Sequence, residues 1–178
     1  MIDEENPERL RQAFVGAMAR VVSSVTIVTT DGPAGRFGVT VSAMSSVSAD
    51  PPLILACINR RSPACRAIAE NRVFGVNVLA STQRHVAQTF AGRPERGRPF
   101  DFGCARWRVQ ITGAPILEGS VAAFDCRLLT AYDAGTHRIF IGEVLEATTA
   151  PGDPLLYGER RYGRRVALAG PEPTPQSG

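Results

Sequence analysis

The chain contains no lysine: its 20 basic side chains, among 178 residues, are all arginines. This absence excludes a Schiff-base lysine, a lysine-dependent phosphate loop and a Ser–Lys catalytic pair. The chain has only 2 histidines, His85 and His137, and neither lies in an H-E-x-x-H motif, so a zinc site is not expected. A formal charge of +3 is too small to predict a nucleic-acid partner.

Signals for secretion, membrane insertion and disulfide bonding are also missing. The 4 cysteines, at positions 57, 65, 104 and 126, form no C-x-x-C pair, so we expect reduced thiols, a cytoplasmic protein and no metal. No apolar run approaches the ~20 residues of a membrane helix. Residues 1–168 suit one domain that buries roughly two thirds of its unfolded surface. The Pro-rich segment 169–178 is expected to be a disordered tail.

Three segments are typical of helices. Residues 6–8 (Asn-Pro-Glu) predict the start of the first helix, because Asn caps and Pro suits the first turn. Ser62-Pro63 predicts the start of a second helix that Asn71 ends, and Ser81 is expected to cap a third that runs to Ala91. The first helix should carry one apolar face formed by Leu10, Phe14, Met18 and Val21.

The rest of the chain predicts seven or eight short strands separated by Gly, Pro and Asp. The segments 21–30 and 36–48 should form a hairpin, and 53–58 is wholly apolar, which indicates burial on both faces. Their hairpin-like spacing favours a mainly β fold, an antiparallel barrel with helical decoration, over a βαβ sheet. The remaining strand segments lie near 73–79, 105–112, 120–132, 138–148, 155–157 and 161–163.

The segment from Gly38 to Ser48 is the densest chemical signal, with five hydroxyl side chains within nine residues. Small hydroxyls and exposed backbone N–H groups bind a phosphate or a flat polar ring without a cationic loop. The alternative is an edge strand whose outward face simply carries Thr and Ser. Composition alone leaves both interpretations open.

The segment Gly38 to Leu53, followed by ACINR at 56–60, resembles the flavin-binding segment of the short-chain flavin reductases, the small components of two-component flavin-dependent monooxygenases. The resemblance continues in order through FGVNVL at 74–79, FAG at 90–92, GTHRIFIGEV at 135–144, and PLLY at 154–157 with the later Tyr162. It implies an FMN-binding split β-barrel with Greek-key-like connections, usually a homodimer that binds FMN or FAD near the subunit interface.

The positions that match the family's motifs imply which residues bind the flavin and the nicotinamide. The residues implied are Thr40, Val41, Ser42 and Ala43 at the flavin ring, Ser45 and Ser46 near the ribityl phosphate, Cys57, Ile58, Asn59 and Ser62 continuing the pocket, Phe90 and Ala91 at the phosphate end, Tyr162 in the closing motif, and His137 at the nicotinamide.

The resemblance implies an NAD(P)H:flavin oxidoreductase that passes hydride from NADH or NADPH to FMN or FAD and supplies reduced flavin to a partner monooxygenase. The flavin carries the redox chemistry, and the protein aligns the two rings, so no protein acid, nucleophile or metal is needed. An alternative is a flavin-binding electron-transfer module that does not use NAD(P)H. Thr136, where the family usually has Asp, keeps this alternative open, and Ser24 stands where Gly is common.

Two arginine clusters remain. The loop around Phe100 and Trp107 interleaves arginines with aromatic rings, a pattern that binds single-stranded nucleic acid, although Glu95 and Asp101 interrupt it. We favour a solvated loop and no nucleic-acid partner. The second cluster contains side chains that could contact a pyrophosphate or a 2′-phosphate in a bidentate fork; it consists of Arg160, Arg161, Arg164 and Arg165.

Overall fold

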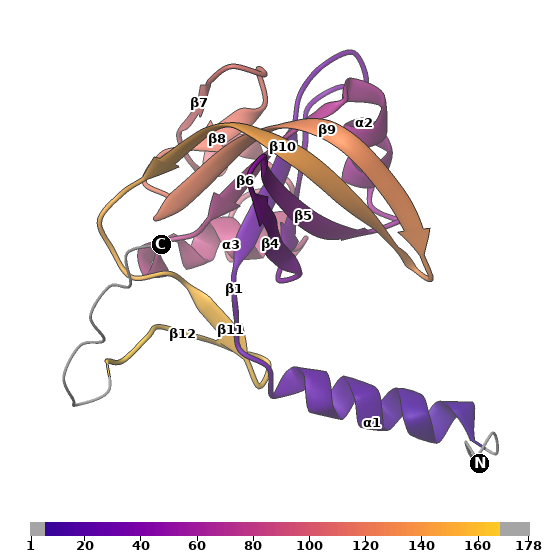
Figure 1. Ribbon diagram of the computed structural model, residues 1–178. Helices are drawn as coiled ribbons and strands as arrows, with labels where there is room; N and C mark the ends of the chain where they lie inside the picture. Colours follow the sequence, from indigo (N-terminus) through magenta and orange to yellow (C-terminus); the bar gives the residue numbers. More distant parts are fainter. Residues whose placement is uncertain (1–5, 168–178) are drawn as a thin grey trace.

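A computed structural model describes residues 6–167. These build three sheets, with orders β1-β11-β12 and β7-β8 in the two small ones, and a seven-stranded sheet with β9 and β10 as its long upper arch (Figure 1). The strand order is β3-β2-β6-β9-β10-β5-β4, and every neighbouring pair is antiparallel. The elements are α1 (Pro7–Ala19), β1 (Ser23–Ser24), β2 (Thr26–Thr30), β3 (Phe37–Val41), β4 (Met44–Ala49), β5 (Pro52–Asn59), α2 (Pro63–Asn71), β6 (Val73–Val78), η1 (Ser81–Gln83), α3 (Arg84–Phe90), η2 (Phe102–Cys104), β7 (Trp107–Val109), β8 (Pro115–Leu117), β9 (Ala122–Ala134), β10 (His137–Thr149), β11 (Leu156–Gly158) and β12 (Arg161–Gly163).

The two ends of the sheet order, β3 and β4, follow each other in the chain with only residues 42–43 between them, so the sheet curves back on itself. The backbone N–H of Cys57 on β5 donates to the carbonyl of Ala43 at 2.9 Å, which extends the β4–β5 ladder into this connection. A sheet that returns to itself in this way leaves fewer unpaired edge groups. The expected fold class, mainly antiparallel β with three helices, is therefore confirmed.

Two apolar clusters fill the interior. One lies between the sheet and α2, and its fully buried members include Ile68, Phe74 and Phe140. The other lies under α3, around Ile27, Leu79 and Phe90. Burial of this apolar surface is the main favourable term in folding.

Asn77 belongs to the FGVNVL segment, and its role is structural. Its side chain is fully buried. The amide donates to the carbonyl of Ile27 at 3.1 Å and accepts from the N–H of Leu117 at 2.7 Å. A buried amide needs such partners, and here they join β6 to β2 and β8.

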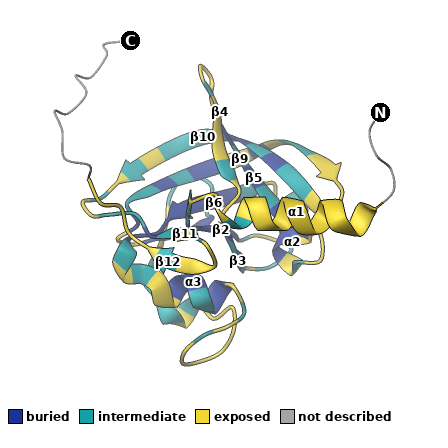
Figure 2. Ribbon diagram, turned by 90° about the horizontal axis from the view of Figure 1, so that it is seen from below, coloured by how far each residue is buried: buried dark blue, intermediate teal, exposed yellow. Residues whose placement is uncertain are grey.

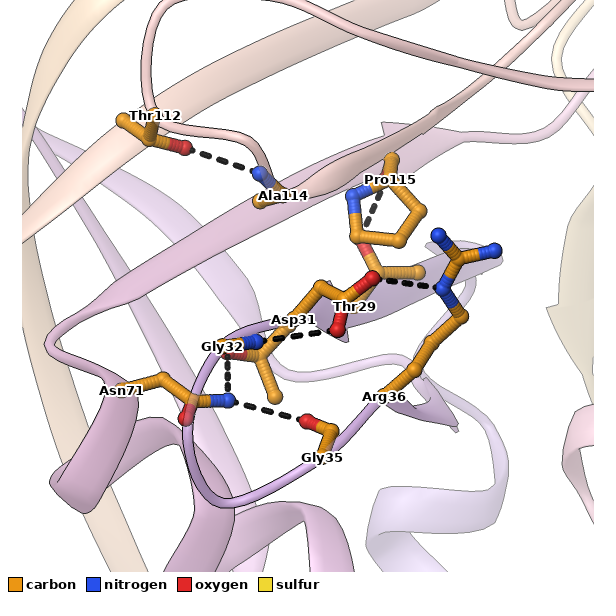
Figure 3. A network of polar contacts seen from close by, with 10 residues as sticks. Thr29, Asp31, Gly32, Gly35, Arg36, Asn71, Thr112, Ala114 and Pro115 are labelled. Atoms are coloured by element: carbon orange, nitrogen blue, oxygen red, sulfur yellow. Dashed lines mark hydrogen bonds and ion pairs between the residues drawn. The ribbon is translucent and has the colours of Figure 1, made fainter.

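A second polar network fixes the turn that leads into β3 (Figure 3). Asn71, at the end of α2, donates to the carbonyl of Gly35 at 3.0 Å and accepts from the N–H of Ala34 at 2.8 Å. The Asp31 carboxylate accepts from Arg36 at 2.7 Å. This exposed turn is therefore held to the body of the protein at several points.

Several strand predictions were wrong because long-range pairing decides where strands break. The predicted strand 36–48 is two strands, since the chain turns at Ser42-Ala43 and β3 and β4 lie at opposite ends of the sheet order. The segment 21–30 is also divided: β1 pairs with β11, whereas β2 pairs with β3 and β6. The structure has more strands than expected, and β8 was not predicted at all.

Two further expectations need correction. In β5, Ile54, Ala56 and Ile58 are buried, but the alternate residues are only half-buried, so one face of the strand packs and not both. The predicted helix 81–91 begins as a 3-10 turn in which the Gln83 side chain, and not Ser81, accepts the Ala80 N–H at 3.0 Å.

Two aromatic side chains of the arginine-rich loop pack in the second apolar cluster, whereas Phe100 is 52% exposed. Phe102 and Trp107 pack edge-on against buried Phe90, with ring centroids at 4.9 and 5.6 Å. Rings held in this way are not free to stack on bases, so the nucleic-acid alternative loses two of its three rings. No helix in residues 6–167 is long and apolar enough to cross a membrane. The tail prediction, 169–178, lies outside the described residues.

Helix α1 extends away from the sheet, and none of its residues is buried (Figures 1 and 2). Asn6 caps it as predicted, accepting the Arg9 N–H at 3.0 Å. The expected apolar face is present but is open to solvent in this chain: Leu10 is 71% exposed and Phe14 62%. An amphipathic helix normally buries that face.

Candidate functional site

A hollow of about 420 Å³ lies where β3, α3 and the β11–β12 hairpin meet. We call it the main hollow. Its volume falls in the range of small-molecule sites. The residues that line it are Val25, Thr40, Val41, Ser42, Gln88, Ala91, Arg93, Tyr157, Arg160 and Tyr162.

The floor of the main hollow is the end of β3. This strand closes one end of the sheet order and pairs only with β2, so its other edge presents backbone N–H and C=O groups. The Thr40 hydroxyl donates to the carbonyl of Ala87 at 2.7 Å, which ties β3 to α3. Thr40 therefore positions the floor with its side chain and leaves backbone groups for a ligand.

Gln88 supplies an unused acceptor. Its side-chain oxygen is buried and has no hydrogen-bond partner among the described residues, although Gln88 lines the main hollow. A buried, unpaired acceptor is rare and needs an explanation. A ligand carrying an N–H group, such as the imide N–H of an isoalloxazine ring, would satisfy it. The residues present therefore fit a flavin.

Two tyrosines form the hairpin side of the main hollow. The Tyr157 and Tyr162 rings meet edge-on with centroids 5.3 Å apart, and the Arg84 guanidinium lies 5.5 Å from the centre of the Tyr162 ring. Burial raises the pKa of Tyr162 above its usual value, and Tyr157 adds to this effect. Tyr162 therefore stays a neutral phenol, a group that can donate a hydrogen bond to a ligand.

A second hollow of about 220 Å³ lies farther back along β3, beside the start of α2. The residues that line it are Arg36, Phe37, Gly38, Ser62, Pro63, Ala64 and Phe100. Ser62 precedes α2, yet its hydroxyl makes no capping hydrogen bond. Hydroxyls and free N–H groups at a helix start favour an anion. The two hollows therefore share β3, with residues 37–38 in one and 40–42 in the other.

Gly38 allows this close packing. A Cβ at that position would lie 2.6 Å from Cε1 of the Phe90 ring, which is fully buried. No side chain fits at that distance. Gly38 thus lets β3 rest directly on the second apolar cluster.

The structure brings together only part of the predicted site. Thr40, Val41, Ser42, Ala91 and Tyr162 line the main hollow, and Ser62 lines the second. The others lie elsewhere in this chain: Ala43 at the turn after β3; Ser45 and Ser46 on β4, with Ser46 in a separate groove beside Met44; Cys57, Ile58 and Asn59 on β5, with Ile58 in the core; and Phe90 in the core under α3.

His137 begins β10 at the tip of the long β9–β10 hairpin. It pairs with Asn59 across the sheet and is exposed. Its Nδ1 lies 2.9 Å from the Thr136 hydroxyl, so Thr136 contacts the imidazole at the place where the family usually has Asp. His137 does not line the main hollow.

Sequence reasoning left out several residues of the main hollow. Gln88 lies on a helix with no motif to mark it. Tyr157 lies in the PLLY motif, and Arg160 and Arg93 lie in the two arginine clusters, but none of these signals predicts a position at the site. Val25 carries no signal, because only folding brings it to β3.

Comparison with known proteins accounts for this arrangement. The flavin reductase like domain family matches residues 18–165. A protein of Ancylobacter novellus named FMN reductase (NADH) RutF is 42% identical over 169 residues, covering 90% of this chain and 92% of the relative. The corresponding protein of Agrobacterium fabrum is 39% identical over 163 residues, covering 90% and 92%.

Solved structures of flavin reductases also match this chain. BorF, described as the flavin reductase component of a bacterial two-component tryptophan halogenase, matches with a TM-score of 0.78 and 35% identity, covering 89% of this chain and 99% of that one. An NADH:FAD oxidoreductase of Streptomyces globisporus matches with a TM-score of 0.77 and 31% identity, covering 94% and 98%. The chain, with its ring-sized hollow on the edge of β3, belongs to the flavin reductase like domain family.

Proposed function

We propose that this flavin reductase oxidises NADH, reduces FMN at the main hollow, and releases the reduced flavin to a separate monooxygenase. The balance is NADH, FMN and one proton giving NAD⁺ and reduced FMN. The observation that carries the proposal is the hollow on β3, whose lining includes Gln88 with its buried and unpaired side-chain oxygen. The relatives named NADH-dependent FMN reductases support the choice of NADH and FMN.

The residues of the main hollow would hold the flavin ring. A bound flavin supplies the redox chemistry by accepting hydride from the nicotinamide and carrying the electron pair onward. The backbone edge at residues 40–42 and the Tyr162 phenol offer donors, and Gln88 offers an acceptor. Fixed donors near the ring stabilise the negative charge that reduction brings.

The second hollow would hold the flavin phosphate. It contains the start of α2, the uncommitted Ser62 hydroxyl and the Arg36 side chain. Between residues 38 and 41 a strand rises about 10 Å, a length comparable to that of a five-carbon ribityl chain. The predicted role of Ser62 in the flavin pocket is consistent with this placement.

A partner oxygenase is proposed because structural relatives are components of two-component systems. Two structural relatives are described as parts of such systems: BorF, and a homologue of nitrilotriacetate monooxygenase component B from Mycobacterium thermoresistibile (27% identity, TM-score 0.84). The two hollows are open to solvent, so reduced flavin has an exit. A cytoplasmic location, where NADH is available, belongs to the same proposal.

A homodimer is also proposed, and α1 supports it. The helix shows Leu10, Phe14 and Met18 to solvent in the isolated chain, an apolar stripe that a second copy would cover. Phe14→Glu should convert a dimer to a monomer in size-exclusion chromatography with light scattering. Arg9→Glu, a change on the same helix outside that stripe, is the matched control. A monomeric wild-type protein would contradict the proposal.

The reaction is tested by mixing purified protein anaerobically with NADH or NADPH and excess FMN or FAD, and following loss of the visible absorbance of oxidised flavin. NADH with FMN should give the highest kcat/KM. If bound flavin is reduced by dithionite but by neither nicotinamide, the chain is an electron-transfer module and the proposal fails.

A further inference from the structure

Two arginines at the main hollow lack acidic partners. Arg93 and Arg160 both line it, and neither forms an ion pair within residues 6–167. Neighbouring arginines differ: Arg84 pairs with Glu95 at 3.3 Å and Arg36 with Asp31 at 2.7 Å. Two unpaired cations beside one hollow are complementary to an anion.

The backbone of Arg160 adopts a strained conformation at this position. It and Glu159 form the two-residue turn between β11 and β12, and both have positive φ, 60° and 49°. This kind of turn favours Asn and Gly, because side chains with a Cβ are strained in the left-handed region. Strain retained at a ligand-sized hollow suggests a functional reason.

Neighbouring contacts keep the turn in place. The Glu159 N–H donates to the carbonyl of Ala19 at 2.5 Å, and its carboxylate lies 3.5 Å from Arg20. Both the backbone and the side chain of Glu159 therefore contact the end of α1. Arg160, the other turn residue, lines the main hollow and also borders a smaller hollow beside Arg11 and Val15 of α1.

We propose that Arg93 and Arg160 bind the diphosphate of the nicotinamide dinucleotide that donates the hydride. Guanidinium groups bind phosphate oxygens in a bidentate fork. The proposed function assigns the flavin phosphate to the second hollow, beside Ser62 and α2, which leaves the donor diphosphate for these arginines. This assignment rests on the proposed function and adds to it the residues that select a dinucleotide donor.

The test compares donors with and without phosphate. Arg160→Gly is the main variant, because glycine adopts the turn without strain, and Arg93→Gln is the second. Arg161→Ala changes the next arginine, which does not line the main hollow, and is the matched control. Each protein is assayed with NADH and with N-benzyl-1,4-dihydronicotinamide, which has no phosphate. Calorimetry with ADP-ribose, the donor without its nicotinamide, measures binding directly.

Loss of one charged contact corresponds to about a tenfold rise in the KM for NADH. ADP-ribose should bind the two variants weaker by a similar factor, whereas the rate with the benzyl donor falls far less and Arg161→Ala resembles the wild type. Arg160→Gly should melt no lower than the wild type, which separates lost binding from lost folding.

Three results would overturn the assignment: an equal loss with both donors, unchanged ADP-ribose affinity, or weakened FMN binding with unchanged riboflavin binding, which would make the arginines ligands of the flavin phosphate. If the wild type reduced flavin with neither donor, the proposed function would fail instead. ADP-ribose binding would still decide the role of the arginines.

Discussion

Replacing Gln88 with Met should strengthen the flavin-free protein and weaken flavin binding. Methionine has a similar length and helix propensity but no amide. The Gln88 oxygen is buried without a partner, and such a group costs about 1–3 kcal/mol. Because the side chain as a whole is only half-buried, the lower end applies. The free energy of unfolding should rise by about 1 kcal/mol, or about 2–4 °C in melting temperature for a chain of this size.

Flavin affinity should change in the opposite direction. One neutral hydrogen bond contributes about 1 kcal/mol, so the Kd for FMN should rise about fivefold. Urea unfolding of the flavin-free protein measures the first effect, and quenching of flavin fluorescence measures the second.

Gln110 provides a matched control for this experiment. Its side-chain oxygen is also buried and unpaired, but it does not line either hollow. Gln110→Met should therefore be stabilised like Gln88→Met and bind FMN like the wild type. The assignment of Gln88 to the flavin would be refuted by unchanged affinity in Gln88→Met, or by equal losses in both variants.

Three further predictions follow from named contacts. Gly38→Ala places a Cβ 2.6 Å from the buried Phe90 ring and should lower the free energy of unfolding by about 1–3 kcal/mol in a denaturant titration; an unchanged midpoint would mean that β3 moves freely. His137→Ala should raise the KM for NADH more than the Kd for FMN, and equal changes would count against a nicotinamide contact. Burial raises the pKa of Tyr162, so the folded chain keeps that proton longer than the unfolded chain, and stability falls as the pH rises above about 10. Tyr162→Phe should flatten that fall, and an unchanged slope would contradict it.

The fold class could be predicted from the sequence, because turn residues and β-branched runs are local signals. The two helix starts at Asn6 and at Ser62-Pro63 were likewise visible, although only Asn6 makes a capping hydrogen bond. The break at Ser42-Ala43 was not, since it depends on which distant strand each half joins. The three-residue β8 has too few residues for a pattern and exists through its pairing with β7.

The candidate site was predictable only where a contiguous motif lines it. Residues 40–42 form such a motif, and the resemblance placed them at the ring. Gln88 and Arg93 come from α3 and the loop after it, so their meeting with β3 is a product of folding. The arginine cluster drew attention to Arg160. The direction of its side chain, however, depends on a turn with positive φ, and a Glu-Arg sequence does not predict such a turn.

The hydrogen-bonded turn before β3 has a consequence for which sequence changes this protein can accept. Asn71 and the Asp31–Arg36 pair fix residues 31–36, and the turn sets the β2–β3 register, Thr30 opposite Phe37 through Thr26 opposite Val41. A one-residue deletion there would slip β3 by one position and turn every side chain to the opposite face. Both hollows would be lost at once. Surface loops usually accept insertions and deletions, but the length of this one fixes which β3 side chains reach the site.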